Sequence, residues 1–216
     1  MKVNKNSSVY IIVYATVMVV VVAAVLAICA MVLQPIQNAN VERETKGALL
    51  TVAGMSVATE EIEKAYAENI TEVQVAASDG GSLPLYQSSV GGRTLYIIPV
   101  AGSGLWGPVW GYVALDGDWS TISAVVFDHK GETPGLGAEI AAPVFMDQFV
   151  GKQLFEGDNL VGITVLKGAG ASQGNPHAVD AISGGTITSR AVETMIRTTL
   201  EEYKPYIEKQ RSNGND

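Results

Sequence analysis

The amino-acid sequence predicts an α+β protein, in which a single N-terminal transmembrane helix precedes one exported domain built from a mainly antiparallel sheet flanked by helices. Three observations lead to this prediction: a long uncharged apolar segment near the N-terminus, several β-strand segments separated by short turns, and an amphipathic segment near the C-terminus. The sequence is therefore divided into a membrane anchor at 1–35, a stalk with leading helices at 36–90 and a ligand-binding domain at 91–216.

The apolar segment runs from Val9 to Leu33 and contains no charged residue. A helix of about 25 residues is roughly 37 Å long, enough to cross a hydrocarbon core of about 30 Å. Many residues are β-branched, but in lipid the backbone must satisfy its own hydrogen bonds, which favours a helix. A cleaved signal peptide is the alternative, although its apolar region is usually shorter. A lipoprotein cleavage site at Cys29 is disfavoured by the bulky Ile28 and by the apolar residues that follow.

Charges around this segment predict the orientation of the chain. Lys2 and Lys5 precede it, whereas all 22 acidic residues follow it. The positive-inside rule places the N-terminus in the cytoplasm of a bacterium and the remaining domain on the outer, periplasmic face of the inner membrane. Membrane lipid is thus an expected partner. The formal net charge of −8 and the lack of a basic cluster argue against nucleic acid.

Cysteine and histidine usage excludes several kinds of site. The single cysteine, Cys29, lies within the apolar segment, so the exported domain can form no disulfide, thiolate zinc site or cysteine-ligated iron–sulfur cluster from this chain. His129 and His177 are isolated, with no other ligand at metal-binding spacing. We therefore predict no metal site.

The stalk and the beginning of the domain are predicted as helices and strands in turn. Pro35 is expected to end the membrane helix. A short helix at 41–54 ends at Gly54, and a second at 58–70 has Thr59 as its N-cap. The segment from Val73 to Gly92 allows no assignment. The strands that follow are expected at 94–100, 108–116, 120–129 and 160–167, with the Asp116–Asp118 turn joining the second and third.

Two further helices are expected in the domain. Residues 138–151 place Ile140, Val144, Phe145 and Phe149 at helical spacing. Residues 189–209 show the strongest helical pattern of the domain. One face of that helix is predicted to carry Val192, Met195, Ile196, Thr199, Leu200 and Tyr203.

Three glycine-marked segments interrupt these patterns, and the first two are residues 102–112 and 129–140. In the first, glycines surround two tryptophans, including Trp106; a bulged strand with core aromatics is the simpler interpretation. In the second, the glycines allow backbone N–H groups to face a ligand, although an ordinary strand-to-helix loop would look the same. Glu132 could hydrogen-bond a heterocycle or be solvated.

The third segment is Val179–Glu193, with Gly-Gly followed by a helix expected to begin near Ser189 and to hold Glu193 in its first turn. A phosphate would be favoured at such a helix N-terminus. The segment lacks the features of a P-loop, a dinucleotide fingerprint or a serine-hydrolase elbow. Local chemistry does not choose an attachment point among the four hydroxyls Ser183, Thr186, Thr188 and Ser189.

Residues 180–186, Asp-Ala-Ile-Ser-Gly-Gly-Thr, resemble the flavinylation motif Asp-x-x-Ser/Thr-Gly-Ala-Thr of bacterial membrane flavoproteins, with Gly185 where alanine is usual. His-Lys-Gly-Glu-Thr-Pro-Gly-Leu-Gly at 129–137 resembles the loop that this FMN-binding family places against the flavin. Gly-Leu-Trp-Gly-Pro at 104–108 is similar to the corresponding strand in the C subunits of Na⁺-translocating NADH:quinone reductases. The order of these motifs behind one span matches that family along nearly the whole chain.

The resemblance implies that a flavin transferase joins the phosphate of FMN to Thr186 as a phosphoester. It also implies an electron-relay role among the other subunits of a membrane redox pump. The G subunit of the Rnf ferredoxin:NAD reductase, and an anchored binding module without enzymatic function, are the alternatives. The cofactor-binding residues implied by the motifs are Asp180, Ser183, Gly184, Gly185, Trp106, Glu132, Thr133, Gly135, Leu136 and Gly137.

Overall fold

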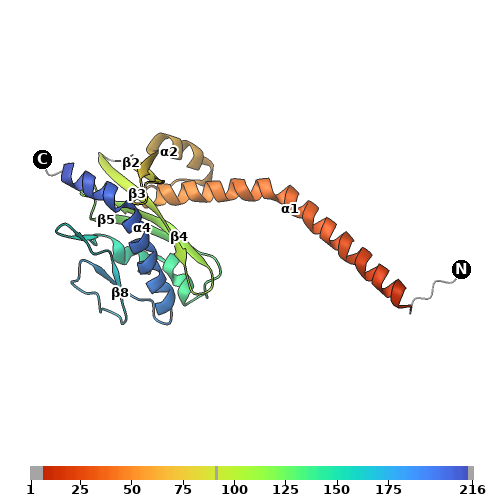
Figure 1. Cartoon of the computed structure of the whole chain (residues 1–216). Helices are drawn as coiled ribbons and strands as arrows, with labels where there is room; N and C mark the ends of the chain where they lie inside the picture. The colour runs from red at the N-terminus through yellow and green to blue at the C-terminus, as the bar shows by residue number, and fades with distance from the viewer. Residues whose placement is uncertain (1–6, 91, 214–216) are drawn as a thin grey trace. The chain divides into compact units, whose positions relative to one another are not determined.

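The computed structural model describes residues 7–90 and 92–213 (Figure 1). By its contacts the chain divides into two compact units, Met1–Thr45 and Lys46–Asp216. Helix α1 (Ser8–Val52) is long and apolar enough to cross a membrane. It continues through Pro35, so the prediction that this proline ends the helix was wrong. Proline removes one backbone hydrogen bond, which long apolar helices tolerate.

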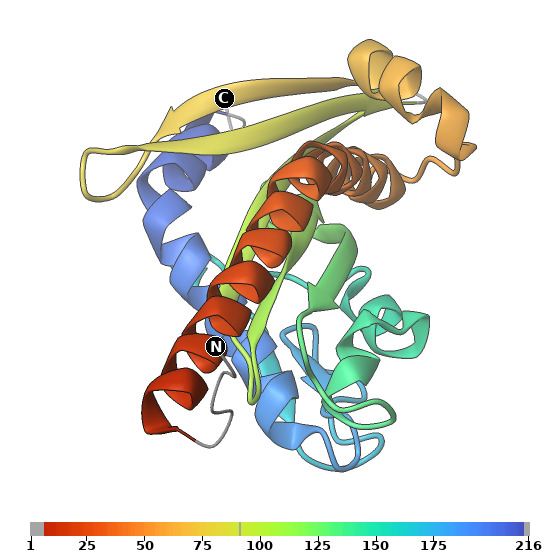
Figure 2. The same ribbon diagram turned by 90° about the vertical axis from the view of Figure 1, so that its right-hand side faces the viewer.

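The second unit contains a five-stranded antiparallel sheet in which each strand pairs with its neighbours in sequence. The strands are β1 (Ile70–Ala76), β2 (Ser82–Val90), β3 (Arg93–Ser103), β4 (Pro108–Leu115) and β5 (Ile122–His129). Their arrangement confirms the predicted fold class, and Figure 2 shows the long strands side by side. Strands β1 and β2 occupy residues that showed no clear sequence pattern or were expected to form a stalk.

Each face of the sheet is covered by helix. In β3, Ile97 points to one face, while Ile98 and Val100 point to the other. The Ile97 face packs on the end of α1 and on α2 (Ile62–Asn69). The opposite face packs on α4 (Thr186–Asn213), seen in blue in Figure 1. The buried apolar residues of α4 are Val192, Met195, Ile196, Leu200, Tyr203 and Ile207, which confirms the predicted apolar face, with Thr199 only partly buried.

Residues 137–149 form three short turns instead of the predicted single helix. These are η2 (Gly137–Ala141), α3 (Pro143–Met146) and η3 (Asp147–Phe149). Ala142 is extended (φ −85°, ψ 142°), because the following proline disfavours the helical conformation. The break changes which side chains are buried: Phe145 and Phe149 lie in the core, but Val144 is 83% exposed.

Other predicted boundaries also change. The strand expected at 160–167 is divided between β7 (Asn159–Leu160), which pairs with β6 (Phe155–Glu156), and β8 (Thr164–Leu166), with Gly162 at φ +69° between them. Strand β8 pairs in parallel with β9 (Ala178–Asp180). The predicted N-cap is also wrong, because residues 59–61 form a 3-10 turn (η1, Thr59–Glu61) before α2.

Candidate functional site

The Gly-Gly turn, defined here as residues 181–185, connects β9 to α4. Gly184 has φ +75°, a conformation that glycine adopts at little cost. The N–H of Gly185 donates to the carbonyl of Ile182 at 3.0 Å. Ser189 closes the turn, since its Oγ accepts from the Ile182 N–H at 3.1 Å and donates to the Gly185 carbonyl at 2.9 Å.

Helix α4 begins at Thr186 rather than at Ser189, so Glu193 lies in its second turn and not in its first. There Glu193 Oε2 accepts a hydrogen bond from the N–H of Val165 at 2.8 Å. In the part of the chain that the structure describes, the N–H groups of residues 186–188 donate to no protein acceptor. These N–H groups and the helix dipole favour an anion at this end of α4.

Burial separates the four hydroxyls that the sequence left as alternatives. Thr188 and Ser189 are 1% and 0% exposed, and both hydroxyls are hydrogen-bonded within the protein. Ser183 is exposed and Thr186 is partly buried. Only Ser183 and Thr186 therefore present a hydroxyl that another molecule could reach.

A cavity of about 460 Å³ lies beside Thr186. It brings together residues from all three glycine-marked segments, which lie far apart in the sequence. Its lining is Leu105, Trp106, Glu132, Thr133, Leu136, Gly137, Gly184, Gly185, Thr186, Ile187 and Thr188. Its size lies within the range of about 300–1,000 Å³ typical of small-molecule sites.

A second cavity, of about 590 Å³, also includes Thr186 and Gly184. Asp180 and Ser183 line this cavity rather than the first, so the motif residues are divided between the two. Lys167 also lines it and offers a cation that sequence reasoning missed. The parallel pairing of Leu166 with Asp180 brings Lys167 here, and no local pattern indicates such a pairing.

Glu132 is 4% exposed, so its solvated alternative is excluded. Its Oε1 accepts from the N–H of Trp106 at 2.8 Å, and its Oε2 accepts from Thr188 Oγ1 at 2.7 Å. Burial alone would raise the pKa of Glu132. Hydrogen bonds from the Trp106 N–H, the Thr188 hydroxyl and the N–H groups of Gly107 and Leu105 outweigh burial and hold the pKa below its ordinary value.

Asp180 accepts hydrogen bonds from the residues just after Lys167. Its Oδ1 accepts from the N–H of Ser172 at 2.7 Å, and its Oδ2 accepts from the N–H of Gly170. The hydrogen bond from the Ser172 backbone is the main cause of a lowered pKa at Asp180. Both carboxylate oxygens thus order the loop 167–172, which lies beside the second cavity.

Gly185 departs from the alanine of the motif, and the structure gives a physical reason. A Cβ at Gly185 would lie 2.8 Å from the carbonyl oxygen of Leu136 and 3.0 Å from Ile182 Cγ2. The loop 132–137 therefore packs against the backbone of the Gly-Gly turn.

Gly135 is the one predicted contact that lines neither cavity. Its N–H donates to Glu139 Oε1 at 3.1 Å.

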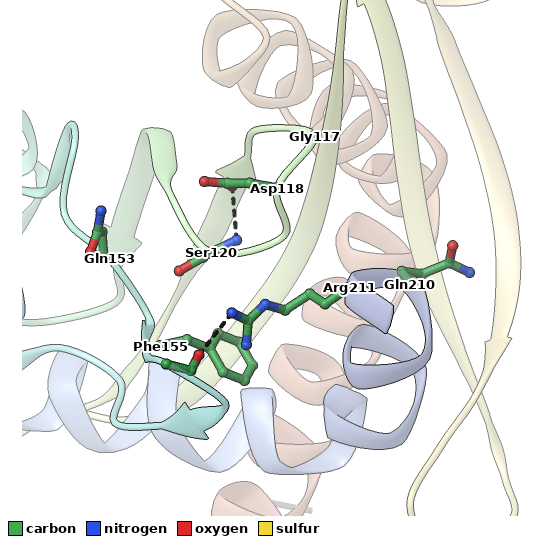
Figure 3. Close-up of a pocket in the computed structure, with 8 residues that line it drawn as sticks. Gly117, Asp118, Ser120, Gln153, Phe155, Gln210 and Arg211 are labelled. Atoms are coloured by element: carbon green, nitrogen blue, oxygen red, sulfur yellow. Dashed lines mark hydrogen bonds between the residues drawn. The ribbon is translucent and has the colours of Figure 1, made fainter. Parts of the chain in front are cut away.

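A polar cavity of about 410 Å³ lies elsewhere, between the β4–β5 turn and the end of α4 (Figure 3). Its charged groups already have partners. Asp118 accepts from the N–H groups of Ser120 and Thr121, and Arg211 lies 4.0 Å from the Phe155 ring centroid while donating to the Gly157 carbonyl at 2.9 Å. The Asp118 bonds order the β4–β5 turn, and the Arg211 contacts anchor the end of α4.

The site beside Thr186 fits FMN in its chemistry. Four apolar side chains are exposed around the first cavity: Leu105, Trp106, Leu136 and Ile187. They offer faces for a flat ring, while the start of α4 offers N–H groups for a phosphate. Among the described residues, no group of three or more histidine, cysteine, aspartate or glutamate side chains could hold a metal ion.

Comparisons with known proteins agree with this assignment. The model of a family described as FMN-binding domain matches residues 104–201. The C subunit of the Na⁺-translocating NADH-quinone reductase from Neisseria meningitidis is 31% identical, over 90% of this chain and 94% of its own length. The crystal structure of the C subunit from Parabacteroides distasonis has a TM-score of 0.74 and 34% identity, covering 81% of this chain and 96% of that one. The chain therefore belongs to the family of C subunits of the Na⁺-translocating NADH-quinone reductase, an oxidoreductase complex, and carries its FMN-binding domain.

Proposed function

We propose that this chain carries FMN covalently on Thr186 through a phosphoester and relays electrons within a Na⁺-translocating NADH:quinone reductase. The observation that carries the proposal is the position of Thr186. Thr186 is only partly buried, is the first residue of α4 and lines both cavities of the site. Of the alternatives Ser183, Thr188 and Ser189, the last two are buried, and the motif's register favours Thr186 over Ser183.

The chain's own residues bind and orient the cofactor in this proposal. The N–H groups of residues 186–188 would face the phosphate, and Lys167 would contribute a positive charge from the lining of the second cavity. Trp106 and Leu136 would supply apolar faces for the ring. FMN supplies the redox chemistry, and attachment through the phosphate leaves its ring unmodified. The remaining predicted contacts, Asp180, Ser183, Gly184, Gly185, Glu132, Thr133, Gly135 and Gly137, stay predictions.

Helix α1 supports a single-pass anchor in membrane lipid, with the FMN-binding domain on the outer face of a bacterial inner membrane. The sidedness is inferred from Lys2 and Lys5, which precede the helix in the sequence. A flavin transferase would modify Thr186 once, during maturation. The other subunits of the complex would deliver and accept the electrons.

Co-expression with the transferase, followed by denaturing electrophoresis, tests this proposal. The wild-type chain should give a fluorescent flavin band, and Thr186→Val should abolish it. Ser183→Ala and Thr188→Val should keep the band at reduced or unchanged intensity. A band that persists in Thr186→Val would disprove the attachment site. A wild-type chain without any band would instead favour an anchored binding module that has no covalent flavin.

A further inference from the structure

Glu132 lies where the three glycine-marked segments meet. It belongs to the loop 132–137, and its two carboxylate oxygens reach out of that loop in different directions. One accepts from the N–H of Trp106, in the turn of residues 104–107, at 2.8 Å. The other accepts from the hydroxyl of Thr188, in the first turn of α4, at 2.7 Å. A single side chain thus connects the walls of the first cavity.

The position of the same carboxylate explains why two positions in these segments are occupied by glycine. A Cβ at Gly104 would lie 2.5 Å from Glu132 Oε1. A Cβ at Gly137 would collide with both Glu132 Oε2 and Thr188 Oγ1. Neither glycine has a positive φ. Both positions therefore need glycine because a Cβ would collide with neighbouring atoms, and not because of an unusual backbone conformation.

The carboxylate is held by dipoles instead of by a cation. Among the described residues, Glu132 forms no salt bridge, unlike Glu63, Asp116 and Glu208, which pair with lysine or arginine. Backbone N–H groups of residues 105–107 point at Glu132 and favour its ionised form, which keeps its pKa low despite burial. The first cavity therefore contains a fixed, buried negative charge.

We propose that Glu132 is the positioning residue of the flavin site: it locks the 104–107 turn to the first turn of α4, and its charge opposes reduction of a flavin held in the cavity. The first part concerns contacts of this chain alone. The second part rests on the proposed function, because it requires FMN in the first cavity. A nearby negative charge disfavours the gain of electrons, so it lowers the flavin's midpoint potential.

Two substitutions separate position from charge. Glu132→Gln removes the charge but keeps an oxygen that can accept from the Trp106 N–H. Glu132→Asp keeps the charge but is one methylene shorter, so it cannot span both partners. Glu201→Gln, an exposed position on α4, changes the net charge by the same amount and serves as the control.

The first measurement is hydrogen–deuterium exchange on the full chain in detergent, made without the transferase and therefore without covalent flavin. Glu132→Asp should speed exchange of the 104–107 amides by about tenfold or more, and Glu132→Gln should speed it less. Glu201→Gln should match wild type. Wild-type exchange at 104–107 in both Glu132 variants would overturn the positioning role. This result is independent of whether Thr186 is ever flavinylated.

The second measurement is a spectroelectrochemical titration of the flavinylated full chain. Glu132→Gln should shift the midpoint potential upward relative to wild type, whereas Glu132→Asp and Glu201→Gln should leave it nearly unchanged. An unshifted potential in Glu132→Gln would overturn the electrostatic role. If wild type itself carries no covalent flavin, the proposed function fails, while the exchange experiment still decides the positioning role.

Discussion

Glu132 and Asp180 are two carboxylates that line different cavities, and both cavities include Thr186. Each accepts hydrogen bonds from backbone N–H groups of a neighbouring segment, and each has a lowered pKa. They differ in their surroundings. Glu132 is almost fully buried and joins three segments, whereas Asp180 is partly exposed and orders one nearby loop.

This difference shows that an acidic residue in a cofactor motif can use its carboxylate to stabilise the protein backbone. Asp180 is the first residue of the segment that resembles the flavinylation motif, yet both its oxygens accept from the loop 167–172. Glu132 lies outside that motif, yet it contacts the first turn of α4 directly through Thr188. The first cavity with its lining residues, called the Glu132 side, should therefore be more rigid than the second cavity with its lining residues, called the Asp180 side. Substitutions on the Glu132 side should also lower the stability of the protein more.

Glu132→Gln should have the largest effect on stability. It weakens charge-assisted hydrogen bonds in a buried place, so we expect a loss of about 2–3 kcal/mol in the free energy of unfolding. Chemical denaturation of the full chain in detergent, followed by circular dichroism, measures this loss. Glu201→Gln should stay within about 0.5 kcal/mol of wild type. Equal stability of the two variants would remove the distinction between the two carboxylates.

Gly185→Ala should come next, with a loss of about 1–2 kcal/mol from overpacking. The new methyl group would press on the Leu136 carbonyl, which belongs to the Glu132 side. Hydrogen exchange should consequently rise in residues 132–137 and stay unchanged in residues 167–172. Faster exchange in residues 167–172 alone would show that the turn is coupled to the Asp180 side instead.

Asp180→Asn should cost less, about 1 kcal/mol, because the group is partly exposed and its partners lie in one loop. The expected signature is faster exchange of the Gly170 and Ser172 amides, read by hydrogen–deuterium exchange. Residues 104–107 should keep their wild-type protection. A loss as large as that of Glu132→Gln would mean that both sides contribute equally to the fold.

The pH dependence gives the smallest and most specific effect. The folded-state pKa of Glu132 is lowered, so its contribution is fully present above the unfolded pKa of glutamate and is lost as the pH falls through the folded pKa. The stability difference between wild type and Glu132→Gln should therefore be constant near neutral pH and shrink in acid. Denaturation curves recorded at a series of pH values test this, and a difference that grows in acid would contradict the ionised carboxylate.

Much of the fold could be predicted from local sequence. Alternation identified β3 to β5, and helical spacing identified α4 with its apolar face. Strands β1 and β2 were missed because their polar and exposed residues dilute the pattern. The division of residues 138–151 into three turns was missed because a helix tolerates proline in its first turn, so Pro143 did not argue against one helix. In the structure, Ala142 before this proline is extended and interrupts the helix.

The candidate site was predictable in its residues but not in its internal contacts. The motifs named Thr186, Trp106 and Glu132, and the structure brings all three to one cavity. The bond between Glu132 and Thr188 spans 56 positions, so no local pattern could indicate it. Lys167 was missed for a similar reason, because a parallel strand pair positions it.

Thr186 alone is proposed to be the flavin attachment point, and the cofactor-binding roles assigned to the two cavities depend on it. Proteolysis of the chain after co-expression with the transferase, followed by tandem mass spectrometry, tests this most directly. We predict that the peptide containing residues 180–190 carries the mass of FMN less one water, with fragment ions that place the addition on Thr186. An addition on any other residue, including Ser183, Thr188 and Ser189, or the absence of any addition, would contradict this assignment.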